Sequence, residues 1–156
     1  MKSDDLAFVS MEPDGGAFIA CLAMESALSA KAHLEKLLQK AAEVYHEAVS
    51  AMRTLVGKMR ERRLHRKPVP ARMVWELGHR IFRLKSALAK LSLQLDDLYS
   101  HLTRDLRVKR MWLEKVIIFR RYLPKKGLIP RNLGWGRCSR TPRRAAQLLR
   151  ESVLPD

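Results

Sequence analysis

Cysteine is scarce in this sequence of 156 residues, which contains only Cys21 and Cys138. Two cysteines so far apart give neither a closely spaced metal-binding pair nor a disulfide framework. We therefore expect no metal, no cofactor and a reduced, cytoplasmic setting. Asp4 and Asp5 stand where the start of an export signal would be basic, so we expect no such signal.

Long hydrophobic runs are also missing. The longest, such as residues 17–24, is far shorter than the roughly 20 apolar residues that a membrane-spanning helix needs. We therefore expect no membrane partner.

Motifs that carry catalysis are lacking as well. The sequence has no glycine-rich phosphate loop, no metal-ligand spacing and no serine-nucleophile turn. One pattern remains, because Arg60 and His65 match the loose spacing of arginine and histidine in a class of helical ribonucleases. We expect a protein that is not an enzyme, with a small helical ribonuclease using Arg60 and His65 as an alternative.

Acidic residues are few relative to basic ones, with Asp+Glu 16 against Lys+Arg 31 and a net charge of +15. The excess lies in two stretches. Residues 60–72 contain six basic residues against Glu61, and residues 107–144 contain 13 against Glu114. Such an excess predicts a polyanionic partner, and we expect nucleic acid, RNA or DNA. The alternative is an adaptor whose basic stretches bind an acidic protein.

Arginine outnumbers lysine in both stretches, which favours forked contacts to phosphate and stacking on bases. Trp135 lies between two glycines among arginines, a setting that suits either stacking on an unpaired base or filling an apolar groove. The residues expected to contact nucleic acid are Arg60, Arg62, Arg63, Arg66, Lys67, Arg72, Arg107, Lys109, Arg110, Arg120, Arg121, Lys125, Lys126, Arg131, Trp135, Arg137, Arg140, Arg143 and Arg144.

Apolar residues recur at alternating steps of three and four in two long stretches, about 17–64 and 71–123. We call these positions the seam, and in the second stretch it begins with Val74, Leu77, Ile81, Leu84 and Leu88. A repeat of this kind predicts paired, supercoiling helices. Pro68 cannot continue a helix, so the chain is expected to turn there. The predicted fold is all-α, a long antiparallel coiled-coil-like hairpin over 17–123 with one basic stretch at its turn and the other at its open end.

This register sets Lys31, the polar exception of the first stretch, opposite Asp105, the polar exception of the second. The two residues either form a buried pair that fixes the register, or mark a solvated joint between two shorter helices. In the second case the helix breaks near Arg104–Arg107. Whether 71–123 is one helix or two stays open.

The apolar face of the first helix is wider than one partner helix requires. Its flanking residues Leu28, Leu37, Val44, Val49 and Val56 are expected to form a face for self-association or for other protein subunits. The alternative is that the chain's own tail covers them. Trp75 and Phe82 lie outside the seam. They either belong to the core against a third element or form an exposed contact patch.

Outside the hairpin we expect an acidic irregular lead-in at 1–16 and a basic tail at 124–156. Thr141-Pro142 is a helix-start signal, so a short helix at 142–153 should follow, docked on the wide face of the first helix.

In size, charge and helicity the chain resembles the small all-helical basic subunits of CRISPR effector complexes. It is also similar in general form to the bundle-forming accessory proteins of diversity-generating reverse transcriptases. The resemblance implies what the charge pattern indicates, a non-catalytic RNA-binding or single-strand-binding subunit of a ribonucleoprotein or protein–DNA assembly.

Overall fold

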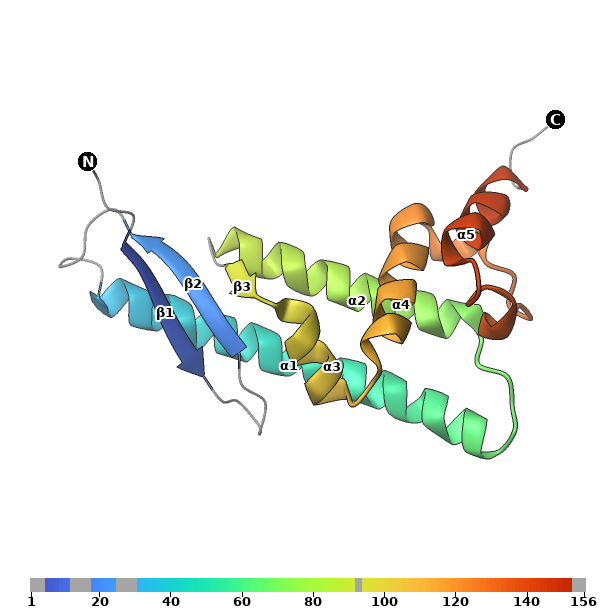
Figure 1. Ribbon diagram of the computed structural model, residues 1–156, viewed down its shortest axis with the longest axis horizontal. Helices are drawn as coiled ribbons and strands as arrows, with labels where there is room; N and C mark the ends of the chain where they lie inside the picture. The colour runs from blue at the N-terminus through green and yellow to red at the C-terminus, as the bar shows by residue number, and fades with distance from the viewer. Residues whose placement is uncertain (1–4, 12–17, 25–30, 92–93, 153–156) are drawn as a thin grey trace.

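The computed structural model describes residues 5–11, 18–24, 31–91 and 94–152. Within these ranges five α-helices form the body of the fold (Figure 1), and the predicted all-α class is confirmed for this body. The helices are α1 Lys31–Leu64, α2 Ala71–Lys90, α3 Leu98–Leu106, α4 Arg110–Tyr122 and α5 Pro142–Glu151. Two single 3₁₀ turns, η1 Lys126–Leu128 and η2 Trp135–Arg137, lie between α4 and α5.

Helices α1 and α2 run antiparallel beside each other (Figure 1), and the chain turns between Leu64 and Ala71 as the proline pattern predicts. In the turn Arg66 adopts a left-handed backbone with φ 56°, and the Lys67 N–H donates to the Arg62 carbonyl at 2.8 Å. The seam positions predicted for α2 are all buried, namely Val74, Leu77, Ile81, Leu84 and Leu88.

The predicted start of the first helix at residue 17 is wrong, because α1 begins at Lys31. Phe18–Met24 instead form strand β2, which pairs antiparallel with β1, Asp5–Met11, and with β3, Gln94–Asp96. The irregular lead-in predicted for 1–16 is therefore also wrong over the seven residues of β1. A short apolar run such as 17–24 suits a buried strand and a helix equally, so periodicity alone does not separate them.

A single second arm running to Leu123 is not what the chain forms. After α2 it passes through β3, and α3 then returns alongside α1 (Figure 1). Of the two alternatives left open for this region, the break near Arg104–Arg107 is the one present, since Arg107 has a left-handed φ of 54° between α3 and α4. Asp97, with φ 52°, marks a further break, which the three-four repeat does not indicate.

Asp105 is buried, 8% exposed, and its carboxylate contacts Tyr45 and the adjacent Arg104 rather than Lys31. The Tyr45 hydroxyl donates to Asp105 Oδ2, and the Arg53 Nε donates to the Asp105 carbonyl at 3.1 Å. Burial, and then the hydrogen bond to Asp105, raise the pKa of Tyr45 above its ordinary value. Lys31 is exposed and precedes Tyr45 by about 20 Å of helix. The predicted register is therefore wrong at this level, because the chain reverses direction between α2 and α3, before it reaches Asp105.

Helix α4 crosses α2 where Gly78 allows a close approach (Figure 1). A Cβ atom at Gly78 would lie 2.8 Å from the Arg120 Cβ and 3.0 Å from the Val116 carbonyl oxygen. The helix after Thr141 is present but packs on α4 and not, as expected, on α1. Its Arg143 guanidinium lies 4.7 Å from the Tyr122 ring centroid.

Candidate nucleic-acid interface

The two basic stretches meet at one end of the molecule, the end that carries the α1–α2 turn. The Ala71 N–H donates to the Leu133 carbonyl at 2.9 Å, and the Trp135 N–H donates to the Val69 carbonyl at 2.7 Å. Hydrogen bonds of this kind hold the tail against the turn. The expectation of a rod with positive charge at two opposite ends is therefore wrong. We call residues 60–72 the turn cluster, residues 107–144 the tail cluster, and the two together the basic end.

Two arginines of the turn cluster, Arg60 and Arg72, hold the tail cluster in place, and a third, Arg62, braces the turn itself. Arg60 donates to the carbonyls of Leu106, at 3.1 Å, and of Arg107. Arg72 Nε donates to the Ile129 carbonyl at 2.6 Å, and Arg62 Nε donates to the Pro68 carbonyl at 2.9 Å within the turn. Each contact uses one or two of the five N–H donors of a guanidinium, so these arginines combine a structural role with remaining hydrogen-bonding capacity.

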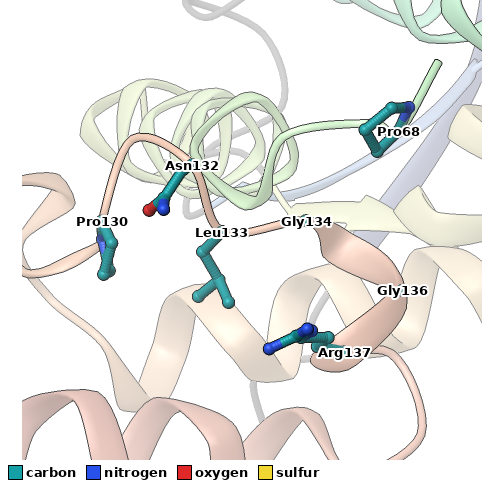
Figure 2. Close-up of a pocket in the computed structure, with 7 residues that line it drawn as sticks. All are labelled: Pro68, Pro130, Asn132, Leu133, Gly134, Gly136 and Arg137. Carbon is teal, nitrogen blue, oxygen red and sulfur yellow. The ribbon is translucent and has the colours of Figure 1, made fainter.

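A pocket of about 490 Å³ lies between turn and tail (Figure 2). Pro68 of the turn lines one side. The tail lines the rest with Pro130, Asn132, Leu133, Gly134, Gly136 and Arg137. In Figure 2 the Asn132 amide and the Arg137 guanidinium project from the tail backbone. The pocket therefore combines the Arg137 cation, the Asn132 amide and apolar proline rings. Arg66, Lys67 and Arg131 are close in sequence to the residues that line it.

Ten cationic side chains of the basic end are exposed and make no hydrogen bond, ion pair or ring contact within the part of the chain that the structure describes. They are Arg66, Lys67, Arg107, Lys109, Arg121, Lys125, Arg131, Arg137, Arg140 and Arg144. All ten belong to the set predicted from sequence. We refer to them as the free cations.

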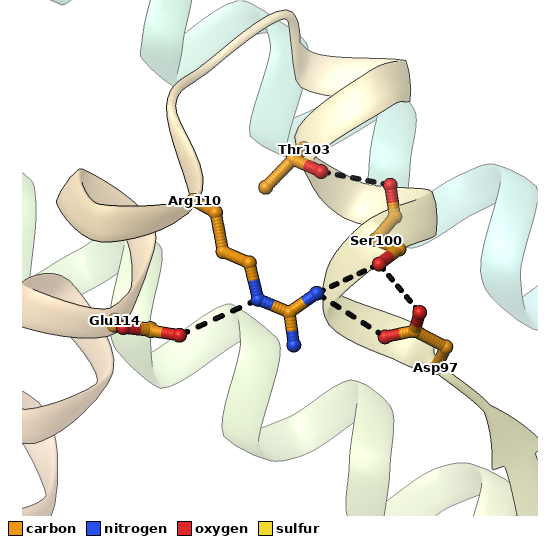
Figure 3. A network of polar contacts seen from close by, with 5 residues as sticks. All are labelled: Asp97, Ser100, Thr103, Arg110 and Glu114. Atoms are coloured by element: carbon orange, nitrogen blue, oxygen red, sulfur yellow. Dashed lines mark hydrogen bonds and ion pairs between the residues drawn. The ribbon is translucent and has the colours of Figure 1, made fainter.

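Arg110 and Lys126, two other predicted contact residues, are engaged with acids. Arg110 Nη1 donates to the Ser100 hydroxyl at 2.7 Å and lies 3.4 Å from Asp97, while its Nε lies 3.4 Å from Glu114 (Figure 3). The hydrogen bond from Ser100 to Asp97 at 2.6 Å, aided by Arg110, lowers the pKa of the Asp97 carboxyl. This network ties the start of α3 to the start of α4.

Lys126 pairs with Glu76 at 3.2 Å. Two acids near the basic end, Glu76 and Glu114, are thus already partnered.

Trp135 is not available for stacking on a base, because only 4% of it is exposed. Its ring meets Phe119 edge-on with centroids 5.3 Å apart, between the tail and α4. Of the two interpretations left open by the sequence, the filled apolar groove is correct. The conspicuous indole of the tail is an anchor that keeps the tail cluster on the hairpin.

The sequence pattern missed a group of stacked side chains at the crossing of α2 and α4. His79 stacks on Trp75 with ring centroids 4.8 Å apart, and Phe82 follows His79 at 6.5 Å. Arg120 of α4 lies over both outer rings, 5.2 Å from the Trp75 centroid and 4.7 Å from the Phe82 centroid. The spacing of 75, 79 and 82 on one helical stripe was the available signal, but the partner arginine lies 38 residues after Phe82.

The predicted assembly face is covered in part by the chain itself. Val49 and Val56 are each 3% exposed and belong to the core, whereas Leu37 and Val44 are partly exposed. Leu28 lies outside the described residues. The wide apolar face of α1 thus packs against α3 as well as α2. The chain itself covers part of this face, as the alternative interpretation expected, but with α3 rather than with the tail.

Comparison with known protein families, with curated proteins and with solved structures finds no match. Among the helices that the structure describes, none is long and apolar enough to cross a membrane.

Proposed function

We propose that this chain is a non-catalytic nucleic-acid-binding protein that grips the phosphate backbone of a single strand, RNA or DNA, with its basic end. Its place would be as a subunit of a ribonucleoprotein or protein–DNA assembly. The observation that supports the proposal most strongly is the meeting of the turn and tail clusters, which gathers cations from residues far apart in sequence.

The physical basis is counterion release. Lysine and arginine side chains that neutralise phosphates free the cations condensed on a nucleic acid, and this gain depends steeply on salt. Seven of the ten free cations are arginines, whose planar guanidinium groups match phosphate oxygens in pairs. No acid of the described residues pairs with these cations, so binding of a phosphate chain would lower their mutual repulsion.

A single strand fits the shape of the basic end better than a regular duplex. The free cations come from the α1–α2 turn, the turn before α4, the last turn of α4, the irregular tail and the first turn of α5, so they do not form one row along a helix. A flexible strand can follow such a path, whereas reading a duplex usually requires a helix or ribbon that enters a groove. The turn–tail pocket, with Asn132 and Arg137, would take a phosphate or a base along that path.

A salt series gives the first prediction. The affinity for a fluorescent single-stranded oligonucleotide should fall linearly, on logarithmic axes, as salt is raised. If about four to six phosphates are neutralised, the slope should be roughly −3 to −4 for a single strand. Fluorescence anisotropy at several salt concentrations measures it.

Two results would count against the proposal. An affinity that does not change with salt concentration would show that the protein does not bind through phosphate contacts. Tighter binding to an acidic polypeptide than to an oligonucleotide of equal charge would favour the adaptor function instead.

A further inference from the structure

The stacked group at the α2–α4 crossing consists of three rings and one cation. Trp75, His79 and Phe82 project from one stripe of α2, and their planes are nearly parallel, with interplanar angles of 13° and 18°. Trp75 anchors the inner end, because it is 5% exposed and its Nε1 donates to the Leu123 carbonyl at 2.6 Å. Phe82 forms the outer end and is 53% exposed.

Arg120 has an unusual environment for a cation. Its Nε donates to His79 Nδ1 at 3.1 Å, and its guanidinium lies against aromatic faces. Within the described residues it contacts no carboxylate, and burial lowers its pKa. A partly buried guanidinium without a counter-anion is stabilised when an anion arrives, and a nucleic acid bound at the basic end would supply a phosphate.

His79 completes the group as a neutral ring. Because Nδ1 accepts the hydrogen bond from Arg120, the ring proton lies on Nε2. Burial, followed by the charge of Arg120, lowers the pKa of His79, so the ring is uncharged near pH 7. The stack therefore presents neutral aromatic surface with the Arg120 guanidinium beside it, an arrangement that suits a nucleobase and its phosphate.

Packing alone does not account for the outer end of the stack. Trp75 is core, as a stripe on a bundle helix usually is, but Phe82 leaves half of its surface in water next to the exposed Arg83. Aromatic rings held in order by neighbours lose little conformational entropy on binding, which makes Phe82 a pre-organised platform. It lies about 18 Å along α2 from Pro70 at the turn, within reach of a strand bound there.

From this geometry we infer that Phe82 is a stacking platform for an unpaired nucleobase, with Arg120 holding the adjoining phosphate. The inference rests on the proposed function and narrows it to single-stranded nucleic acid, because bases inside a duplex do not offer a free face. The stacking role that the sequence suggested for Trp135 thus belongs to a residue of α2.

The test compares three ligands of equal length: a single strand of about twelve nucleotides, a duplex of it and an abasic strand that keeps the phosphates. Anisotropy titrations are run on the full chain with Phe82→Ala, with Phe82→Trp as rescue and with Leu148→Ala as control. Leu148 is matched in exposure, at 55%, and lies on α5.

Phe82→Ala should weaken binding of the normal single strand about 5- to 100-fold while leaving the abasic strand and the duplex unchanged. Phe82→Trp should restore the affinity, and Leu148→Ala should have no effect. Equal binding of normal and abasic strands by the parent protein, or an equal loss for both in Phe82→Ala, would overturn the platform while leaving the phosphate contacts intact. Failure of the parent protein to bind the abasic strand at all would instead refute the proposed function.

Discussion

Reversing the charge of Lys67, Arg131 and Arg137 together is expected to weaken binding of a single strand on the order of 100-fold or more at about 0.1 M salt. Lys67 lies in the turn, and the two arginines lie beside or in the turn–tail pocket. Each substitution by glutamate removes a phosphate contact and adds repulsion. The slope of log affinity against log salt should become shallower by about 2, since roughly 0.7 is lost per phosphate on a single strand.

The control carries the same change in net charge at another place. Lys36 and Lys40 are exposed on the first half of α1, and Lys90 is exposed at the end of α2. Lys36→Glu, Lys40→Glu and Lys90→Glu together should weaken binding only by the general loss of positive charge, about 10-fold or less. Equal losses for the two triple variants would mean that the basic end is not a site. Circular dichroism should show both variants folded, since exposed substitutions rarely cost much stability.

Trp135→Ala is expected to lower the free energy of unfolding by about 3 kcal/mol, which is the lower end of the range for replacing a buried tryptophan by alanine. The side chain fills the space between the tail and Phe119, and its removal leaves a cavity that the helices cannot close. The lower end applies because Trp135 Nε1 is buried with no hydrogen-bond partner among the described residues, which already costs free energy in the native protein. Urea denaturation followed by circular dichroism measures the change.

A second readout locates the damage in the tail. Cys138 is 2% exposed and burial raises the pKa of its thiol, so it should react slowly with a thiol reagent. In a Cys21→Ser background, Trp135→Ala should make Cys138 react at least about ten times faster, because the tail detaches more often. Unchanged stability combined with lost nucleic-acid binding would show instead that Trp135 stacks on a base.

The periodic pattern predicts well which residues are buried, but it predicts poorly which residues they pack against. Val74, Leu77, Ile81 and Leu84 are core as predicted, because a three-four repeat marks one face of a helix. Such a repeat carries no information on the partner of that face. Asp105 was therefore set opposite Lys31, whereas α3 brings it to Tyr45.

The reversal after α2 had a signal that the longer helical pattern outweighed. Leu91, Leu93 and Leu95 alternate with polar residues, which is the period of a strand, and Asp96-Asp97 follows. A strand there places the chain so that α3 can return along α1. Recognising this break would have predicted that the later helices come back toward the turn.

The charge clusters were visible in the sequence, but their meeting was not. The runs of basic residues in the sequence identify each cluster. Whether the two clusters lie together depends on the reversal of the chain between α2 and α3. Likewise, Phe82 stands out as an aromatic residue off the seam, but its relation to Arg120 depends on the crossing of α4 over α2 at Gly78. Long-range packing of this kind is not contained in local periodicity.

If the turn and tail clusters form one binding site, each chain should bind one short strand, and the stoichiometry of binding distinguishes this from two separate sites. Isothermal titration calorimetry with a single strand of roughly eight nucleotides should give one strand per chain. Lys67→Glu in the turn and Arg137→Glu in the tail should each weaken that one binding event. Two strands per chain, with each substitution removing a different one, would contradict a single basic end.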